Sequence, residues 1–168
     1  NRCSIYGANG KLNLIIPVEH NKVLAQQKDG DVKIKWDENW QKQHWKSIAS
    51  AYSSSPFFEF YEDELKAAFF MQPKTLAAFN QGLLRCIFEW LDLEDEFLFS
   101  DKYKALTPLE EYLLNPKQES DKLFPKYVQV FDNKYGFIPN LSVLDLIFNL
   151  GPESCDYLDQ MANPNQGE

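Results

Sequence analysis

One segment near the end of the chain, residues 137–153, reads FIPNLSVLDLIFNLGPE. Either Asn140 or Ser142 can cap a helix here, and the Gly151-Pro152 pair can end it. Nearly every residue between these signals is apolar, which is typical of a helix that is buried on all sides. The segment therefore predicts a buried helix close to the C-terminus.

Three polar residues interrupt this apolar segment: Ser142, Asp145 and Asn149. Their spacing places them on one helical face, and burying such groups costs free energy unless each has a partner. One interpretation is a substrate site, in which Asp145 takes a proton and Asn149 orients an amino or hydroxyl substrate. The other is structural, with both residues bonded to loop and helix-end backbone. The sequence leaves both interpretations open.

Composition narrows the class of protein. The chain has 168 residues, 44% of them hydrophobic and 15% aromatic, which indicates one domain with a well-filled core. The net charge of −8 and the pI near 4.8 argue against nucleic acid as a partner. No run of about 18 apolar residues is present, so we expect no membrane span. Three cysteines without CxxC spacing fit a reduced, cytoplasmic protein.

The first two thirds of the chain predict a hairpin followed by helices. Alternating apolar residues flank a Gly-Ala-Asn-Gly turn within residues 3–18, and Asn-Gly is a strong hairpin signal. Residues 32–36 alternate like a half-exposed strand. Capping residues and apolar periodicity then predict three helices. The first begins near Asp37 or Asn39. The second begins at Ser55-Pro56 and has Phe57 and Phe60 on its apolar face. The third begins at Pro73 to Thr75.

The last third predicts shorter elements around the closing helix. These are strands at 96–100 and 127–131, a helix at 107–114 and a polar loop at 117–121. The whole pattern predicts an α+β fold: a single domain with an N-terminal β-hairpin or small sheet and a helical middle and C-terminal part. We expect the domain to span residues 1–160 and residues 161–168 to form a frayed tail.

His44 is one of two histidines and lies on a stripe with Trp40, Ile48 and Tyr52, which recur every four residues. A histidine among rings has a pKa that burial can tune, so His44 is a candidate general acid or base. The alternative is a hydrogen-bonded histidine at the edge of the core.

Other single residues carry weaker signals. Arg2 could hold a phosphate or carboxylate through two hydrogen bonds, or simply lie at the surface. Gln129 stands in an otherwise apolar predicted strand. Cys155 follows the closing helix and could form an acyl thioester if a base lies nearby, whereas Cys86 falls on an apolar helix face. Two histidines give little material for a zinc site, so we expect neither a metal nor another cofactor.

Three motifs together resemble the WbqC-like family of bacterial proteins. The first is Pro-x-Leu-Ser-x-x-Asp-Leu-x-Phe-Asn-x-Gly, met from Pro139 through Gly151. The second runs from Trp40 through His44, Ile48 and Tyr52 to Pro56 at four-residue spacing. The third is the Arg2 region, followed by a strand that ends in Ile-Pro-Val at 16–18. Family members usually carry a Pro-x-Tyr-x-Pro-like motif further upstream, so we expect that an N-terminal segment is missing.

The resemblance implies a role in O-antigen or other surface-glycan biosynthesis, and a glycine (aminoacyl) transferase acting on a sugar. In such a reaction His44 or Asp145 removes a proton from the attacking group. The residues that would bind a nucleotide-sugar or glycan substrate are Arg2, Trp40, Tyr52, Gln129, Ser142 and Asn149. The competing hypothesis is a non-catalytic binding or assembly protein that works with glycan enzymes. It predicts a closed interior around the last helix and exposure of Trp36, Trp45 and Phe57-Phe58. The oligomeric state is left open.

Overall fold

The N-terminal hairpin forms the sheet found in the part of the chain that the structure describes. The computed structural model describes residues 1–19, 32–36, 39–94, 97, 107 and 124–162. Strands β1 (Arg2–Gly7) and β2 (Gly10–Ile15) pair antiparallel, with Gly7 opposite Gly10 across a two-residue turn. Gly10 has a φ of 96°, a conformation that glycine adopts without a steric penalty. The predicted hairpin is therefore confirmed.

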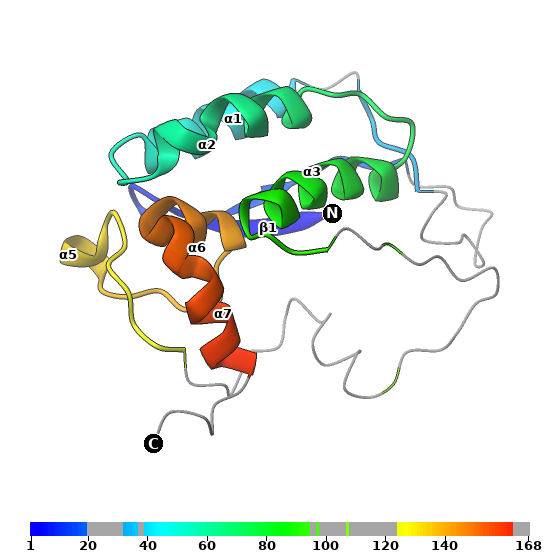
Figure 1. Ribbon diagram of the computed structural model, residues 1–168. Helices are drawn as coiled ribbons and strands as arrows, with labels where there is room; N and C mark the ends of the chain where they lie inside the picture. Colours follow the sequence, from blue (N-terminus) through cyan, green and yellow to red (C-terminus); the bar gives the residue numbers. More distant parts are fainter. Residues whose placement is uncertain (20–31, 37–38, 95–96, 98–106, 108–123, 163–168) are drawn as a thin grey trace.

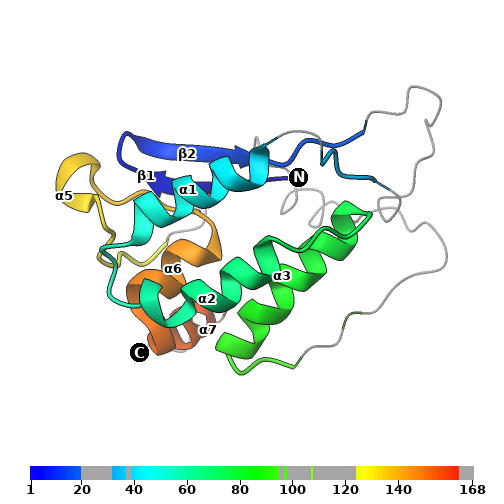
Figure 2. The ribbon, with the colours of Figure 1, turned by 90° about the horizontal axis from the view of Figure 1, so that it is seen from above.

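Helices cover the hairpin and fill most of the rest of the fold (Figure 1). Helix α1 (Trp40–Tyr52) packs on β1, and α2 (Phe58–Phe69) and α3 (Leu76–Trp90) run side by side (Figure 2). Helix α6 (Val143–Leu150) contacts both β1 and α2. Among the described residues, the remaining helical elements are α5 (Asp132–Tyr135), η2 (Gly151–Glu153) and α7 (Ser154–Ala162). The expected α+β class is confirmed.

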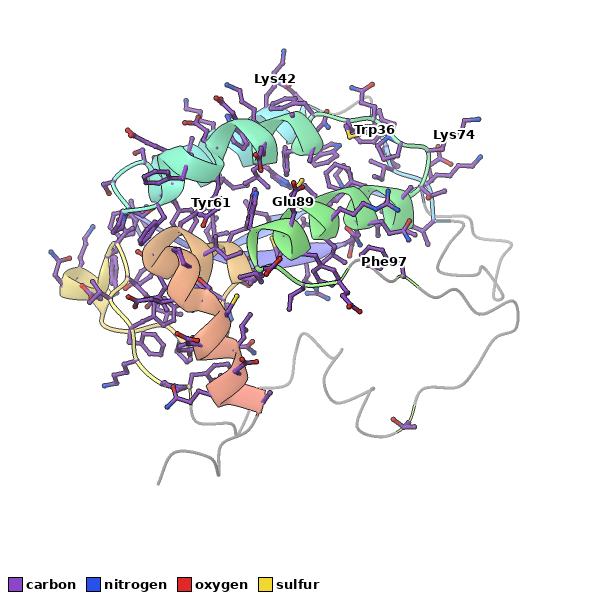
Figure 3. The ribbon with its side chains drawn as sticks, in the orientation of Figure 1. Trp36, Lys42, Tyr61, Lys74, Glu89 and Phe97 are labelled. Carbon is purple, nitrogen blue, oxygen red and sulfur yellow. The ribbon has the colours of Figure 1, made fainter. Side chains whose placement is uncertain are left out.

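The core lies between the hairpin and the helices and is rich in aromatic rings. Tyr6, Tyr52, Phe79 and Phe148 are its largest fully buried side chains. Figure 3 shows side chains filling the layer between α2 and α3, where the Tyr61 ring lies 4.7 Å from that of Trp90. Rings at such spacings contribute packing beyond their buried area.

Two predicted strands are wrong. Residues 32–36 form only isolated bridges, Val18 with Ile34 and Lys33 with Thr75. Residues 127–131 join no sheet and lead directly into α5. The reason in the second case is Gln129, whose amide donates to Ile138 O (3.0 Å) and accepts from Ile138 N (2.8 Å). One side chain thus makes the pair of bonds that a neighbouring strand would otherwise supply.

Helix boundaries also differ from those predicted. Ser55 does not cap α2, because its hydroxyl donates to Tyr52 O (2.6 Å) and closes the end of α1 instead. Helix α2 begins at Phe58, which is buried, and the predicted core residue Phe60 is 76% exposed. The closing helix starts at Val143, because Asn140 has a φ of 54° and Ser142 is the capping residue.

The predicted boundary residues Thr75 and Gly151 do mark helix ends. Thr75 caps α3 as predicted and accepts a hydrogen bond from Ala78 N. Gly151 ends α6 with a φ of 55°, and its Cα faces the Phe57 ring so closely that a Cβ would meet ring atoms at 2.5–2.7 Å. The strand predicted at 96–100, the helix at 107–114 and the loop at 117–121 lie almost wholly outside the described residues. Helix α7 continues through Ala162, and residues 163–168 also lie outside them.

Candidate functional site

A cavity of about 350 Å³ lies between the hairpin, α1, α2, α3 and the start of α6. Its floor is formed by buried apolar side chains: Leu14, Ile48, Leu65, Phe69, Phe79 and Ile87. The polar side chains that line it include Arg2, His44, Asn80 and Ser142. An apolar cavity with a few polar groups is the usual form of a small-molecule site.

His44 reaches this cavity from α1. The four-residue repeat buries Trp40, Ile48 and Tyr52, and it leaves His44 half-buried on the same side of the helix. The His44 ring meets the edge of the Trp40 ring at a centroid distance of 5.3 Å. Burial lowers the pKa of His44, so the imidazole is neutral at pH 7 and can accept a proton.

Ser142 lines the cavity because it caps α6. Its Oγ accepts from Leu144 N (3.4 Å), which leaves Asn140 uninvolved in capping. Its backbone N donates to Ser4 O (2.7 Å), which holds the start of α6 against β1. This bond brings Ser142 to the same cavity as Arg2, the first residue of β1.

Asp145 lies elsewhere and is itself fully buried, within a hydrogen-bond network. Its Oδ1 accepts from the Tyr52 hydroxyl (2.9 Å), and its Oδ2 accepts from the Tyr127 hydroxyl (2.7 Å) and from Gln129 Nε2 (2.8 Å). All three donors are neutral. The carboxylate also lies in the first turn of α6, where the helix dipole favours a negative charge.

The Asp145 network joins four parts of the fold. The Tyr52 hydroxyl accepts from Tyr6 N (3.2 Å), which ties in β1. The Gln129 amide ties in residue 138, and Asn149 Nδ2 donates to Asp145 O (2.7 Å) within α6. We define the Asp145 network as Tyr52, Tyr127, Gln129, Asp145 and Asn149.

Electrostatics in the Asp145 network follow from burial. Burial raises the pKa of Asp145 more than its three hydrogen-bond donors lower it. Burial and the neighbouring carboxylate also raise the pKa of Tyr52 and of Tyr127. Both hydroxyls therefore stay protonated and can donate to Asp145.

The structure sorts the predicted site residues into two groups. Arg2, His44 and Ser142 line the cavity, whereas Tyr52, Gln129, Asp145 and Asn149 belong to the Asp145 network. Trp40 is a core residue whose Nε1 donates to Lys35 O (3.0 Å). Asp145 is absent from the described lining of the cavity, so the two predicted catalytic residues do not share that surface.

Sequence reasoning missed Tyr127 and Asn80. Tyr127 precedes Gln129 by two residues, and this alternation was the only signal that both could face Asp145. Asn80 follows a buried phenylalanine on α3 and carries no signal of its own. A second cavity, of about 220 Å³, shares Ser142 and Val143 with the first and is walled by Phe124, Tyr127, Phe137 and Tyr157, among others.

The three thiols add little to the site. Cys155 Sγ donates to Leu91 O (3.1 Å), and Cys86 Sγ lies 3.6 Å from Gly82 O. Cys3 lines the cavity and is exposed. Within the described ranges, no group of three or more His, Cys, Asp or Glu residues could hold a metal ion. In the same residues, no helix is both long and apolar enough to cross a bilayer.

Comparison with known proteins identifies the family. The sequence model of the WbqC-like protein family matches residues 1–122. The chain therefore belongs to the WbqC-like protein family. It is also 27% identical over 192 residues to "Uncharacterized protein Rv1507c" of Mycobacterium tuberculosis (strain ATCC 25618 / H37Rv), an alignment covering 94% of this chain and 80% of that protein. No solved structure matches the chain.

Proposed function

We propose that this protein is an acyl- or aminoacyl-transferase of bacterial surface-glycan biosynthesis, with a sugar of a nucleotide sugar or glycan as acceptor. The family resemblance suggests glycyl as the transferred group. The observation that carries the proposal is the cavity itself, which gathers His44, Arg2 and Ser142 from three separate parts of the chain. Site residues that converge on one concave surface are the usual mark of a binding or catalytic site.

The proposed reaction uses His44 as general base. An amino or hydroxyl group of the sugar attacks the acyl carbonyl carbon, and neutral His44 takes the proton of that group. A new C–N or C–O bond forms, and the bond from the carbonyl carbon to its leaving group breaks. His44 then gives the proton to the leaving group. Arg2, exposed at the first position of β1, binds a phosphate or carboxylate of a substrate.

Asp145 acts in this scheme as a positioning residue. It bonds to Tyr52, two turns beyond His44 on α1, and it lies in the first turn of α6, three residues after the capping residue Ser142. The Asp145 network thus fixes the two helices that carry His44 and Ser142. The protein works as one domain in the cytoplasm, a location supported by its three free thiols.

A second candidate function is a non-catalytic assembly protein acting with glycan enzymes. Saturation of the Asp145 carboxylate by protein donors favours it, as does exposure of Phe60 and Val128, each 76% exposed. The aromatic residues expected at its surface argue against it. Trp36, Trp45 and Phe57 are half-buried, and Phe58 is buried.

A thermal-shift screen of the full-length protein separates the two functions. The panel contains nucleotide sugars together with acyl and aminoacyl donors. A ligand that binds only the folded state raises its stability by RT ln(1 + [L]/Kd). We expect at least one donor and one acceptor to raise the Tm, and we expect transfer between them to require His44. A flat response across the panel would favour the assembly protein.

A further inference from the structure

The cavity walls indicate which kind of acyl group the protein takes. We propose that the cavity binds an aliphatic acyl chain of about six to twelve carbons without a charged amino group, and that its carboxyl end lies beside Arg2 and His44. This inference rests on the proposed function and deepens it by naming the transferred group. It replaces glycyl, the group that the family resemblance suggests, with an apolar one.

Charge is the first argument. A glycyl group carries an ammonium, which needs a carboxylate or several acceptors when it leaves water. The described lining of the cavity contains Arg2 but no Asp or Glu. Arg2 would repel the ammonium, whereas it complements a carboxylate or an acyl phosphate. The charged group of the ligand is therefore anionic.

The apolar floor is the second argument. Leu65, Phe69 and Phe79 are at most 6% exposed, and Ile48 is 2% exposed. These side chains offer no hydrogen-bond partner to a polar substituent, and they bury CH₂ and CH₃ groups favourably. The polar lining residues Arg2 and Asn80 are exposed, so they lie toward solvent. A ligand with one charged end and one apolar end matches this order.

Size is the third argument. The cavity volume is about 350 Å³. A buried cavity of roughly 150 Å³ accommodates benzene, with its six carbon atoms. In proportion, the cavity holds roughly fourteen non-hydrogen atoms. A glycyl group would leave most of that volume unfilled, whereas a chain of about ten carbons with its carboxylate would occupy it.

The test measures the binding of sodium n-alkanoates of four to twelve carbons to the full-length protein by calorimetry. Each CH₂ buried should tighten Kd about fourfold, until the gain stops near ten to twelve carbons. The matched control ligand is 8-aminooctanoate, which has the chain of octanoate and an ammonium at its far end. It should bind at least about tenfold more weakly than octanoate, because its ammonium meets the apolar floor.

Four variants locate the binding. Leu83→Trp and Leu84→Trp fill the cavity from α3 and should each weaken decanoate binding at least about tenfold. Leu93→Trp, at a half-exposed leucine outside the described lining, should leave it unchanged. Arg2→Gln should weaken decanoate more than decanol while keeping the dependence on chain length. Circular dichroism checks that each variant is folded.

Outcomes separate this inference from the proposed function. A Kd that does not change with the length of the alkanoate would contradict the binding of an aliphatic acyl chain. Equal binding of glycine, octanoate and 8-aminooctanoate would contradict it as well. His44-dependent glycyl transfer alongside such a result would keep the proposed function. Tight decanoate binding that the Leu83 and Leu84 variants abolish would support binding of an acyl chain in this cavity, whatever the result for His44. Normal transfer activity of His44→Gln would reject the proposed function alone.

Discussion

The cavity and the Asp145 network meet at the start of α6, but their polar groups have different surroundings: residues 142–144 line the cavity, whereas the Asp145 carboxylate is bonded to protein donors. In the network, each carboxylate oxygen of Asp145 accepts bonds from protein donors and is fully buried. At the cavity, His44 and Arg2 face a space of about 350 Å³. A polar group whose bonds are already made stabilises a fold, whereas one facing a cavity is available to a ligand.

The variant Asp145→Ala should show the largest effect that separates the Asp145 network from the cavity. The substitution leaves the Tyr52 and Tyr127 hydroxyls and the Gln129 amide without their acceptor. Each unsatisfied buried donor costs about 1–3 kcal/mol, so unfolding in urea should show a loss of about 3 kcal/mol or more. Asp159→Ala, on the exposed face of α7, should change stability by less than about 0.5 kcal/mol. Equal effects of the two variants would break the contrast.

The two tyrosines of the network allow a finer comparison. Tyr52→Phe removes both the bond to Asp145 and the acceptor of Tyr6 N, whereas Tyr127→Phe removes the bond to Asp145 and a longer contact with Gln129 at 3.4 Å. We expect losses of about 2 and about 1 kcal/mol respectively. Both losses are measured by the shift in the midpoint of urea unfolding, provided that the slope of the unfolding free energy against urea concentration is unchanged. A larger loss for Tyr127→Phe would mean that the network is centred away from α1.

The smallest expected effect is the contribution of Asp145 to the pH dependence of the free energy of unfolding. Burial raises the pKa of Asp145 from its ordinary value of 3.8 in the folded protein. The unfolded chain therefore loses this proton first, and the stability that Asp145 contributes falls as pH rises from about 3.8 through the folded pKa, then stays constant. The stability of wild type minus that of Asp145→Asn should fall with pH, by at most about 1.4 kcal/mol per unit. A difference that rises with pH would indicate a lowered pKa.

Local signals in the sequence were enough for much of the fold. The Asn9-Gly10 pair predicted the hairpin turn, and Thr75 predicted the start of α3. Local signals failed where a polar side chain bonded to a different partner from the one that its sequence position suggested. The Gln129 side chain bonds to residue 138 in place of a strand, and Ser55 bonds backward to α1 rather than forward to α2.

The site was only partly predictable for a related reason. The burial of Asp145 was evident from its apolar neighbours, which indicated that it needs partners. Its partners Tyr52 and Gln129 lie 93 and 16 residues away in the chain, and nothing local pairs them with Asp145. The repeat on α1 placed His44 beside the core, but only the packing of α2 and α3 shows that it lines a cavity.

We propose that His44 acts in catalysis and that Asp145 stabilises the fold. The most direct measurement compares His44→Gln with Asp145→Asn for both acyl transfer to a sugar acceptor and the free energy of unfolding. We predict that His44→Gln lowers transfer at least about 100-fold and changes stability by less than about 1 kcal/mol. We predict that Asp145→Asn mainly lowers stability, by about 1–3 kcal/mol. Full transfer by His44→Gln, together with loss of transfer in a fully stable Asp145→Asn, would contradict the account.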